Sequence, residues 1–156
     1  MDNFSEEQKR NYELCNKYPI IIPRDLHGDI VADYNYEYTL LDYINAGWRK
    51  AFGENWAKEL QYAINTLPEA SKDKVYIMDL KEKFGQFRQY LSYYSEDIRK
   101  VIRKYEELSM TTCIDCGEPA THITLGWIFP YCEKCLKTND CVTIEEYFKE
   151  QEIDED

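Results

Sequence analysis

Four cysteines arranged as two C-x-x-C pairs are the residues of this chain best suited to chemistry. They are Cys113, Cys116, Cys132 and Cys135. Zinc prefers four tetrahedral ligands, and two cysteine pairs at this separation are typical of structural zinc sites. Because four thiolates fill that coordination sphere, no position is left for a substrate water. The pattern therefore predicts a structural zinc ion rather than a catalytic one.

The residues around the two pairs predict how a zinc module would be built. Glycine at 117 permits the left-handed turn that points backbone amides at the sulfur atoms. Residues 120–131 read as a hairpin that turns at Gly126, and Thr143 precedes a helix. This order suggests a treble clef or a ribbon-like variant. The alternatives are two reduced pairs without metal, or a redox pair, which the missing βαβ pattern disfavours.

Three other residues are weaker candidates for metal binding. His122 lies between the pairs, but four better ligands are already present, so we expect it on the hairpin surface. Cys141 is close enough in sequence to compete for the metal. Cys15 and Cys141 are both expected to be buried or partly buried thiols.

A possible catalytic group lies near the N-terminus. Asp25, His27 and Asp29 surround a turn, and a histidine between carboxylates can act as a general base or bind a second metal. Turn-forming composition explains the same residues without any activity, and we favour that interpretation. Because nucleotide-binding and nucleophile motifs are also missing, we expect a protein that is not an enzyme.

Cations and aromatic residues alternate in a further segment, residues 72–104. Its candidate binding residues are Lys81, Lys83, Phe84, Arg88 and Tyr90. This mixture can bind single-stranded nucleic acid by base stacking and charge. The alternative is a solvated hairpin beside an ion-paired helix, and we favour it because the rest of the molecule repels phosphate.

The elements that must position these residues make an α+β body. Ser5 begins a capping box for a helix to about Lys17, and residues 19–38 look extended, with strands at 20–22 and 30–38. A short helix after Thr39, a bend and a longer helix over 54–67 come next. A hairpin over 75–92 and a helix over 96–109 complete the body. We assign 1–110 to this body, 111–150 to the zinc module and 151–156 to an acidic tail.

Composition limits the compartment and the partners. The formal net charge is −11, and the residues from 111 to the end carry 3 basic and 11 acidic groups. Such a surface repels phosphate backbones over most of the molecule. No apolar run is long enough for a membrane span, and the N-terminus does not resemble a signal peptide. We therefore expect cytoplasmic residence. In the cytoplasm, paired cysteines bind metal more often than they form disulfides.

Several separated motifs resemble a family of small bacteriophage and prophage proteins. Lys81 to Tyr90 resembles a K-E-K-F-G-x-[LF]-R-x-Y signature, and Ser109, the C-x-x-C-G at 113–117 and the Gly-Trp pairs at 47–48 and 126–127 follow the same order. The resemblance covers about residues 40–136. The family's second ligand pair often ends in histidine, where this chain has Cys135. The resemblance implies a zinc-binding fold and a phage-type origin, hence the bacterial host cytoplasm, and supplies no activity.

Charge, zinc and resemblance together lead to one preferred function. We expect a non-enzymatic acidic protein-interaction module, of the kind that inhibits a host defence system such as an anti-CRISPR protein. Its partner would be a host protein that handles nucleic acid, because an acidic surface can compete for a groove built for phosphates. The alternatives are direct nucleic-acid binding through 72–104 and an enzyme with its site near Asp25, His27 and Asp29.

Overall fold

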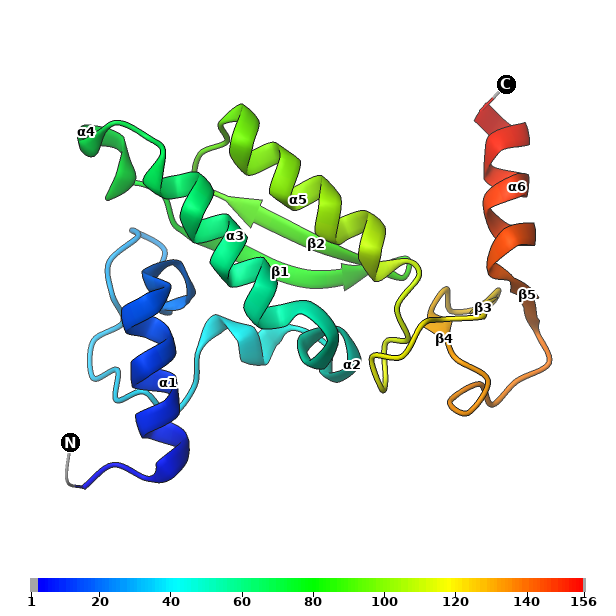
Figure 1. Cartoon of the computed structure of the whole chain (residues 1–156), viewed down its shortest axis with the longest axis horizontal. Helices are drawn as coiled ribbons and strands as arrows, with labels where there is room; N and C mark the ends of the chain where they lie inside the picture. The colour runs from blue at the N-terminus through cyan, green and yellow to red at the C-terminus, as the bar shows by residue number, and fades with distance from the viewer. Residues whose placement is uncertain (1–2, 156) are drawn as a thin grey trace.

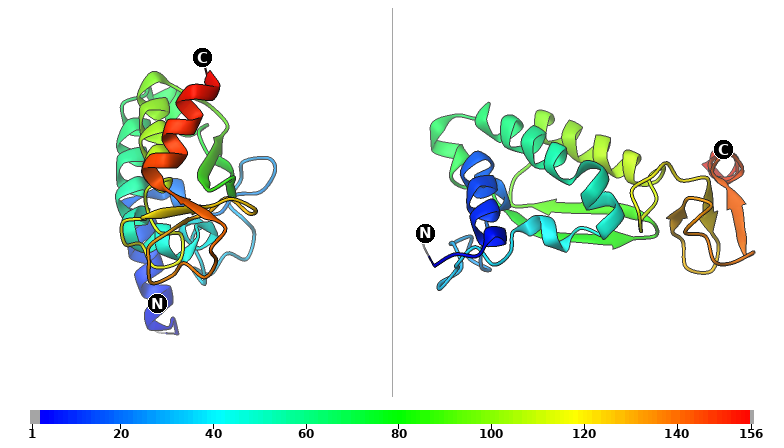
Figure 2. Two further views of the ribbon diagram at one scale, coloured as in Figure 1. Left: turned by 90° about the vertical axis from the view of Figure 1, so that its right-hand side faces the viewer. Right: turned by 60° about the horizontal axis from the view of Figure 1, so that its bottom comes forward.

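The computed structural model describes residues 3–155, which form helices and two small antiparallel sheets. α3 and α5 lie on one face of the β1–β2 hairpin, and the cysteine module follows at one end of the long axis (Figure 1). α1 lies at the opposite end from α6, as Figure 2 also shows. The α+β class is therefore as predicted. No helix between residues 3 and 155 combines the length and apolar content that a bilayer crossing requires.

The first helix begins where its capping box predicts. α1 (Glu6–Lys17) starts after Ser5, whose side chain accepts from the Gln8 amide while the Gln8 side chain accepts from the Ser5 amide. The two strands expected after it are wrong. Pro19–Ile21 forms a 3₁₀ turn (η1), and only one isolated bridge, Arg24 to Ile30, occurs in the second segment. The buried isoleucines need no sheet partner because the Gln61 side chain accepts from the Ile20 amide.

The next helices run together instead of bending apart. A 3₁₀ turn, η2 (Leu40–Tyr43), is capped by Thr39, and then α2 (Ala46–Trp48), a π-helical turn η3 (Arg49–Gly53) and α3 (Glu54–Asn65) follow without interruption. Gly53 lies where a bend was predicted before residue 54, but its φ of −53° is helical. The π-helical turn inserts extra backbone there, and π-turns of this kind often mark functional or packing constraints. α4 (Glu69–Lys72) is a short turn before the hairpin.

The hairpin and the helix that follows it form as predicted. β1 (Ile77–Lys83) pairs with β2 (Gln86–Leu91), and α5 (Glu96–Ser109) begins at Ser95, whose hydroxyl accepts from the Ile98 amide. One face of the hairpin packs against α3 and α5. The aromatic centre of this core contains Trp48, Phe52, Trp56, Phe87 and Tyr105.

The C-terminal part has very short strands. β3 (His122–Thr124) lies between β4 (Pro130–Tyr131) and β5 (Cys141–Thr143) in a three-stranded sheet, and α6 (Ile144–Glu155) follows. The predicted hairpin is present but shorter than 120–131, and β5 was not predicted. Thr143 caps α6 as expected, since its hydroxyl accepts from the Glu146 amide. Residues 151–155, assigned to a tail, continue α6.

Candidate metal centre

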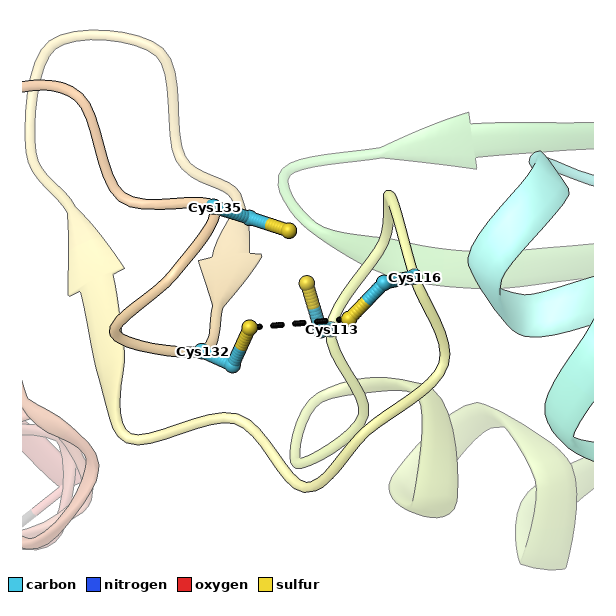
Figure 3. Close-up of side chains that lie close together, drawn as sticks. All are labelled: Cys113, Cys116, Cys132 and Cys135. Carbon is cyan, nitrogen blue, oxygen red and sulfur yellow. Dashed lines mark hydrogen bonds between the residues drawn. The ribbon is translucent and has the colours of Figure 1, made fainter.

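The four predicted cysteines come together in one cluster. The sulfur atoms of Cys113, Cys116, Cys132 and Cys135 all lie within 4.8 Å of one another, and the sulfurs of Cys116 and Cys132 are 3.5 Å apart (Figure 3). A tetrahedron with zinc–sulfur bonds of about 2.3 Å has sulfur–sulfur edges of about 3.8 Å. The donor set, four soft thiols at this spacing, therefore suits a tetrahedral metal ion.

Each cysteine pair lies in a turn that backbone hydrogen bonds hold. In the first turn Gly117 has φ +85°, the Gly117 amide donates to the Cys113 carbonyl at 3.0 Å, and the Cys113 amide donates to the Glu118 carbonyl at 2.7 Å. In the second turn the amides of Cys135 and Leu136 donate to the Cys132 carbonyl at 3.2 and 3.0 Å. Glycine at 117 is needed because a side chain disfavours positive φ.

The thiols of the cluster do not ionise alike. Burial opposes ionisation of Cys132, but hydrogen bonds from the Cys135 amide and from the neighbouring thiols favour its thiolate and lower its pKa to about 7. The Glu118 amide favours the thiolate of Cys116, but burial and the neighbouring sulfurs raise its pKa overall. The hydrogen bond to Cys132, together with burial, raises the pKa of Cys135 to about 12. Without a cation the cluster keeps protons at neutral pH, so metal binding would release them.

The first cysteine turn packs directly on the helix that carries Gly47. The Gly47 amide donates to the Ile114 carbonyl at 2.9 Å, and the Trp48 indole donates to the Thr112 carbonyl at 3.1 Å. A Cβ on Gly47 would lie 2.3 Å from the Cys113 carbonyl oxygen. This close backbone approach accounts for the Gly-Trp pair at 47–48, and it fixes the first ligand pair to the body.

A second contact joins the module to the β1–β2 hairpin. Gly85 has φ +79°, and a Cβ there would lie 2.9 Å from the Ile128 carbonyl oxygen. The Ile114 amide donates to the Pro130 carbonyl at 3.0 Å, which connects the first cysteine turn to β4. The hairpin tip, the first turn and the strand before Cys132 therefore meet beside the cluster.

The weaker metal candidates lie outside the cluster. Cys15 is a buried residue of α1, 3.6 Å from the Tyr34 hydroxyl, and burial raises the pKa of its thiol. Cys141 is half-buried on β5, and His122 is half-buried on β3, where its Nδ1 lies 2.8 Å from the Thr121 hydroxyl. The expected burial of both thiols is confirmed.

The candidate catalytic residues near the N-terminus, Asp25, His27 and Asp29, lie in a turn. The Asp25 carboxylate accepts from the amides of His27, at 2.8 Å, and Asp29, at 3.1 Å, and these bonds lower its pKa. The Asp25 amide donates to the Asp29 carbonyl at 2.8 Å, and Gly28 has φ +84°. These bonds use the Asp25 carboxylate to build the loop, as the turn-forming interpretation predicts.

The candidate binding residues of the hairpin share its outer face. Lys81 lies opposite Arg88, and the Lys81 ammonium is 5.2 Å from the centre of the Tyr90 ring. Lys83, two residues further along β1, lies 5.8 Å from the Phe84 ring centre. Arg88 is drawn toward α5, with its guanidinium 3.9 Å from Glu106. The structure therefore groups Lys81, Lys83 and Tyr90 on the exposed face, with Phe84 at the tip, while the Arg88 guanidinium turns away toward α5.

One group of residues beside the cluster was missed by the sequence analysis. A cleft of about 460 Å³ is lined by the aromatic side chains of Trp127, Phe129 and Tyr131, by the carboxylates of Asp115 and Asp140, and by Lys137. The signal was present, because residues 127, 129 and 131 alternate and so face the same side of an extended segment.

No protein-family model, curated protein or solved structure matches this chain.

Proposed function

We propose that this chain is a non-enzymatic protein-interaction module whose C-terminal part is held by a structural zinc ion. The four-thiol cluster carries this proposal. It joins the two turns that carry the ligand pairs, and four thiolates leave zinc no position for a substrate. Both ligand pairs lie in turns and α6 begins only at Ile144, so a ribbon-like module fits better than a treble clef.

Zinc is the metal we assign because four thiolates suit it and because the module has little core of its own. Its strands contain three, two and three residues. Few of its side chains are buried, among them Cys113, Ile123 and Cys132. Structural zinc contributes roughly 10–16 kcal/mol to peptides of this kind, which is enough to replace a core. The cluster would then carry a net charge of about −2, adding to the acidity of the segment.

An exposed and strained aromatic residue supports an interaction role for the hairpin tip. Phe84 and Gly85 both have positive φ, as a two-residue type I′ turn requires, and asparagine is the favoured residue at the first position. Phenylalanine there is strained, and its side chain is 63% exposed. Folding alone does not favour this choice. Strain of this kind and exposed apolar area are both typical of contact sites.

A second exposed aromatic residue lies across the same junction. Trp127 is 82% exposed, and it directly precedes Ile128, whose carbonyl contacts Gly85. Large aromatic side chains contribute strongly to protein interfaces. We therefore place the interaction surface at Phe84 and Trp127, the two exposed aromatic residues that flank this contact, and we name it the junction surface.

Two measurements on the purified protein test the metal assignment. Elemental analysis should give one zinc per chain, and a chelator should make the cluster thiols reactive toward a thiol reagent. Cys15 should stay protected because it is buried away from the cluster. Absence of bound metal in protein purified under reducing conditions would overturn the zinc assignment.

A substitution at Phe84 separates interaction from folding. Phe84→Asn should raise the free energy of unfolding by about 0.5–1 kcal/mol, since asparagine suits the turn. The same variant, and Trp127→Ala, should lose a partner protein that affinity capture with the wild-type chain retains. Tyr62→Ala, which removes another exposed aromatic residue, is the control. Equal recovery of the partner by all of these proteins would refute the junction surface.

The more specific hypothesis of a phage-encoded inhibitor concerns the identity of that partner. It predicts that the retained protein handles nucleic acid and belongs to a host defence system. Nucleic-acid binding by the chain itself is a second candidate, favoured by the grouping of Lys81, Lys83 and Tyr90 on one face. It predicts salt-sensitive binding of single-stranded DNA or RNA that Lys81→Ala weakens.

A further inference from the structure

We infer that the cleft beside the cysteine cluster binds a cationic side chain, an arginine of a protein partner. This inference rests on the proposed interaction function and specifies the chemistry that the partner presents. The cleft is lined by Trp127, Phe129 and Tyr131 and by the carboxylates of Asp115 and Asp140. Aromatic faces attract cations, and a guanidinium both stacks on a ring and donates to carboxylates.

The Phe129 and Tyr131 rings and the backbone of the loop are held in place before any ligand arrives. The Phe129 and Tyr131 rings meet edge to face, with centroids 6.2 Å apart. The buried Thr124 hydroxyl donates to the Trp127 carbonyl and accepts from the Phe129 amide at 3.0 Å. The Leu125 amide donates to the Asp140 carbonyl at 3.0 Å, which fixes the opposite wall. A loop held in this way loses little entropy on binding.

The charges around the cleft select a cation over a phosphate. Within residues 3–155, neither Asp115 nor Asp140 is paired with a lysine or arginine within 4.0 Å. Cys135 lines the same cleft, so a four-thiolate site would add negative charge. Lys137 is the one cation among the lining residues and opposes the ligand. A single-stranded nucleic acid could stack on the same rings, but its phosphates would meet this negative field.

The cleft is large enough to admit an arginine side chain. About 460 Å³ lies at the lower end of the range for small-molecule pockets. Trp127 stands almost free at the rim, so it can close over a guanidinium without moving the buried parts of the module. We therefore expect arginine to bind more tightly than lysine, because a planar guanidinium can stack on Trp127 while it contacts the carboxylates.

The test is an NMR titration of the full-length, zinc-loaded protein with short peptides. The probes are acetylated Gly-Gly-Arg-Gly-Gly amide, the same peptide with citrulline, which is neutral, or with lysine, and a thymidine oligonucleotide. Trp48 and Trp56 are 0% exposed, so their indole signals are internal controls for that of Trp127. The arginine peptide should shift the Trp127 signal alone and bind about tenfold more tightly than the citrulline peptide, while the oligonucleotide leaves it unchanged.

Substitutions in and away from the cleft show which residues contact the arginine peptide. Asp140→Asn should weaken the arginine peptide several-fold, Lys137→Ala should strengthen it, and Tyr62→Ala should leave it unchanged. Equal binding of the citrulline peptide, or a preference for the oligonucleotide, would overturn the inference. If Trp127→Ala still loses the captured partner in either case, the junction surface stands and only the cationic specificity fails. Zinc content is measured for each variant to confirm that the module is folded.

Discussion

At the scale of single residues, Gln89 is a polar side chain placed in an aromatic core. Its carbonyl accepts from the Trp56 indole at 2.7 Å, and its amide donates to the backbone carbonyls of Phe87 and Ile102, each at 3.2 Å. Both Gln89 and Trp56 are buried. The side chain therefore links β2, α3 and α5, and its removal takes a hydrogen-bond partner from the buried Trp56 indole and from two backbone carbonyls.

Gln89→Ala should consequently lower the free energy of unfolding by about 2–4 kcal/mol. Urea denaturation of the wild-type and variant proteins measures this loss. The same substitution in a Trp56→Phe background should cost less, because the unpaired indole is then absent. Equal costs in both backgrounds would show that the Trp56–Gln89 hydrogen bond does not contribute.

Asp25 is a second residue that stabilises local structure, and the pH dependence of stability should reveal its contribution. Its folded pKa is depressed by backbone donors, so its contribution to stability is complete above the ordinary value near 4 and is lost as pH falls through the lower folded pKa. Asp25→Ala should be less stable than the wild type at pH 7, and the difference should shrink toward pH 2. Thermal unfolding across this range measures it.

His27→Ala is the matched control in the same loop. The Asp25 carboxylate accepts from the His27 backbone amide, which alanine retains, so stability should stay close to that of the wild type. A pH profile of biological function that depends on His27 would contradict the structural interpretation and restore the enzyme hypothesis.

At the scale of elements, Gly47 decides how the module meets the body, whereas Gly126 does not. Gly47 brings α2 within contact of the Cys113 and Ile114 backbone, where no side chain fits. At Gly126 the nearest atom to an added Cβ is the Asp140 carboxylate oxygen at 3.8 Å, which is ordinary contact. The two glycines of the Gly-Trp pairs therefore have different structural roles.

Gly47→Ala should lower the free energy of unfolding by at least about 2 kcal/mol and weaken metal retention, because the Cβ forces the first cysteine turn off the helix. Gly126→Ala should change either quantity by less than about 0.5 kcal/mol. Chemical denaturation and competition with a chelator measure both. If alanine at 47 were tolerated, the contact between α2 and the cysteine turn would have to be looser than in this structure.

Local sequence predicts those elements that are fixed by local signals. Signals within a few residues encode α5, through the Ser95 cap and an apolar stripe. The same is true of the Phe84-Gly85 turn between β1 and β2. The β-branched run at Ile20–22 wrongly suggests a strand. These residues form a 3₁₀ turn instead, in which the Gln61 side chain of α3 accepts from the Ile20 amide. β5 was missed because a three-residue strand has too short a pattern to detect.

The candidate site, too, is predictable from local sequence only in part. Cysteine spacing identifies the ligands, because metal geometry restricts it. The partners of Gly47 and Gly85 are 67 and 43 residues distant along the chain, at Ile114 and Ile128, so no local pattern reveals them. The cleft requires the fold as well, since it unites the loop before β4 with residues near β5.

At the scale of the whole molecule, the chain has one large core and a small module attached to it. The core cluster extends from Cys15 to Tyr105 and takes in Ile114 from the first cysteine turn. Beyond that turn, the sheet β4-β3-β5 and α6 depend on short strands and on the second cysteine pair. Stability should therefore be uneven along the chain, and the metal should control the part that follows residue 113.

Cys116→Ser tests this division. Loss of one ligand should abolish metal retention and speed amide hydrogen exchange at least about tenfold in residues 119–144, because their strands lack a core of their own. The amides of β1, β2 and α5 should keep most of their protection, since the aromatic core around Phe87 needs no metal. Cys141→Ser removes a thiol outside the cluster and should change neither quantity. Cooperative loss of protection throughout residues 6–144 would instead show that the zinc ion stabilises the molecule as a single unit.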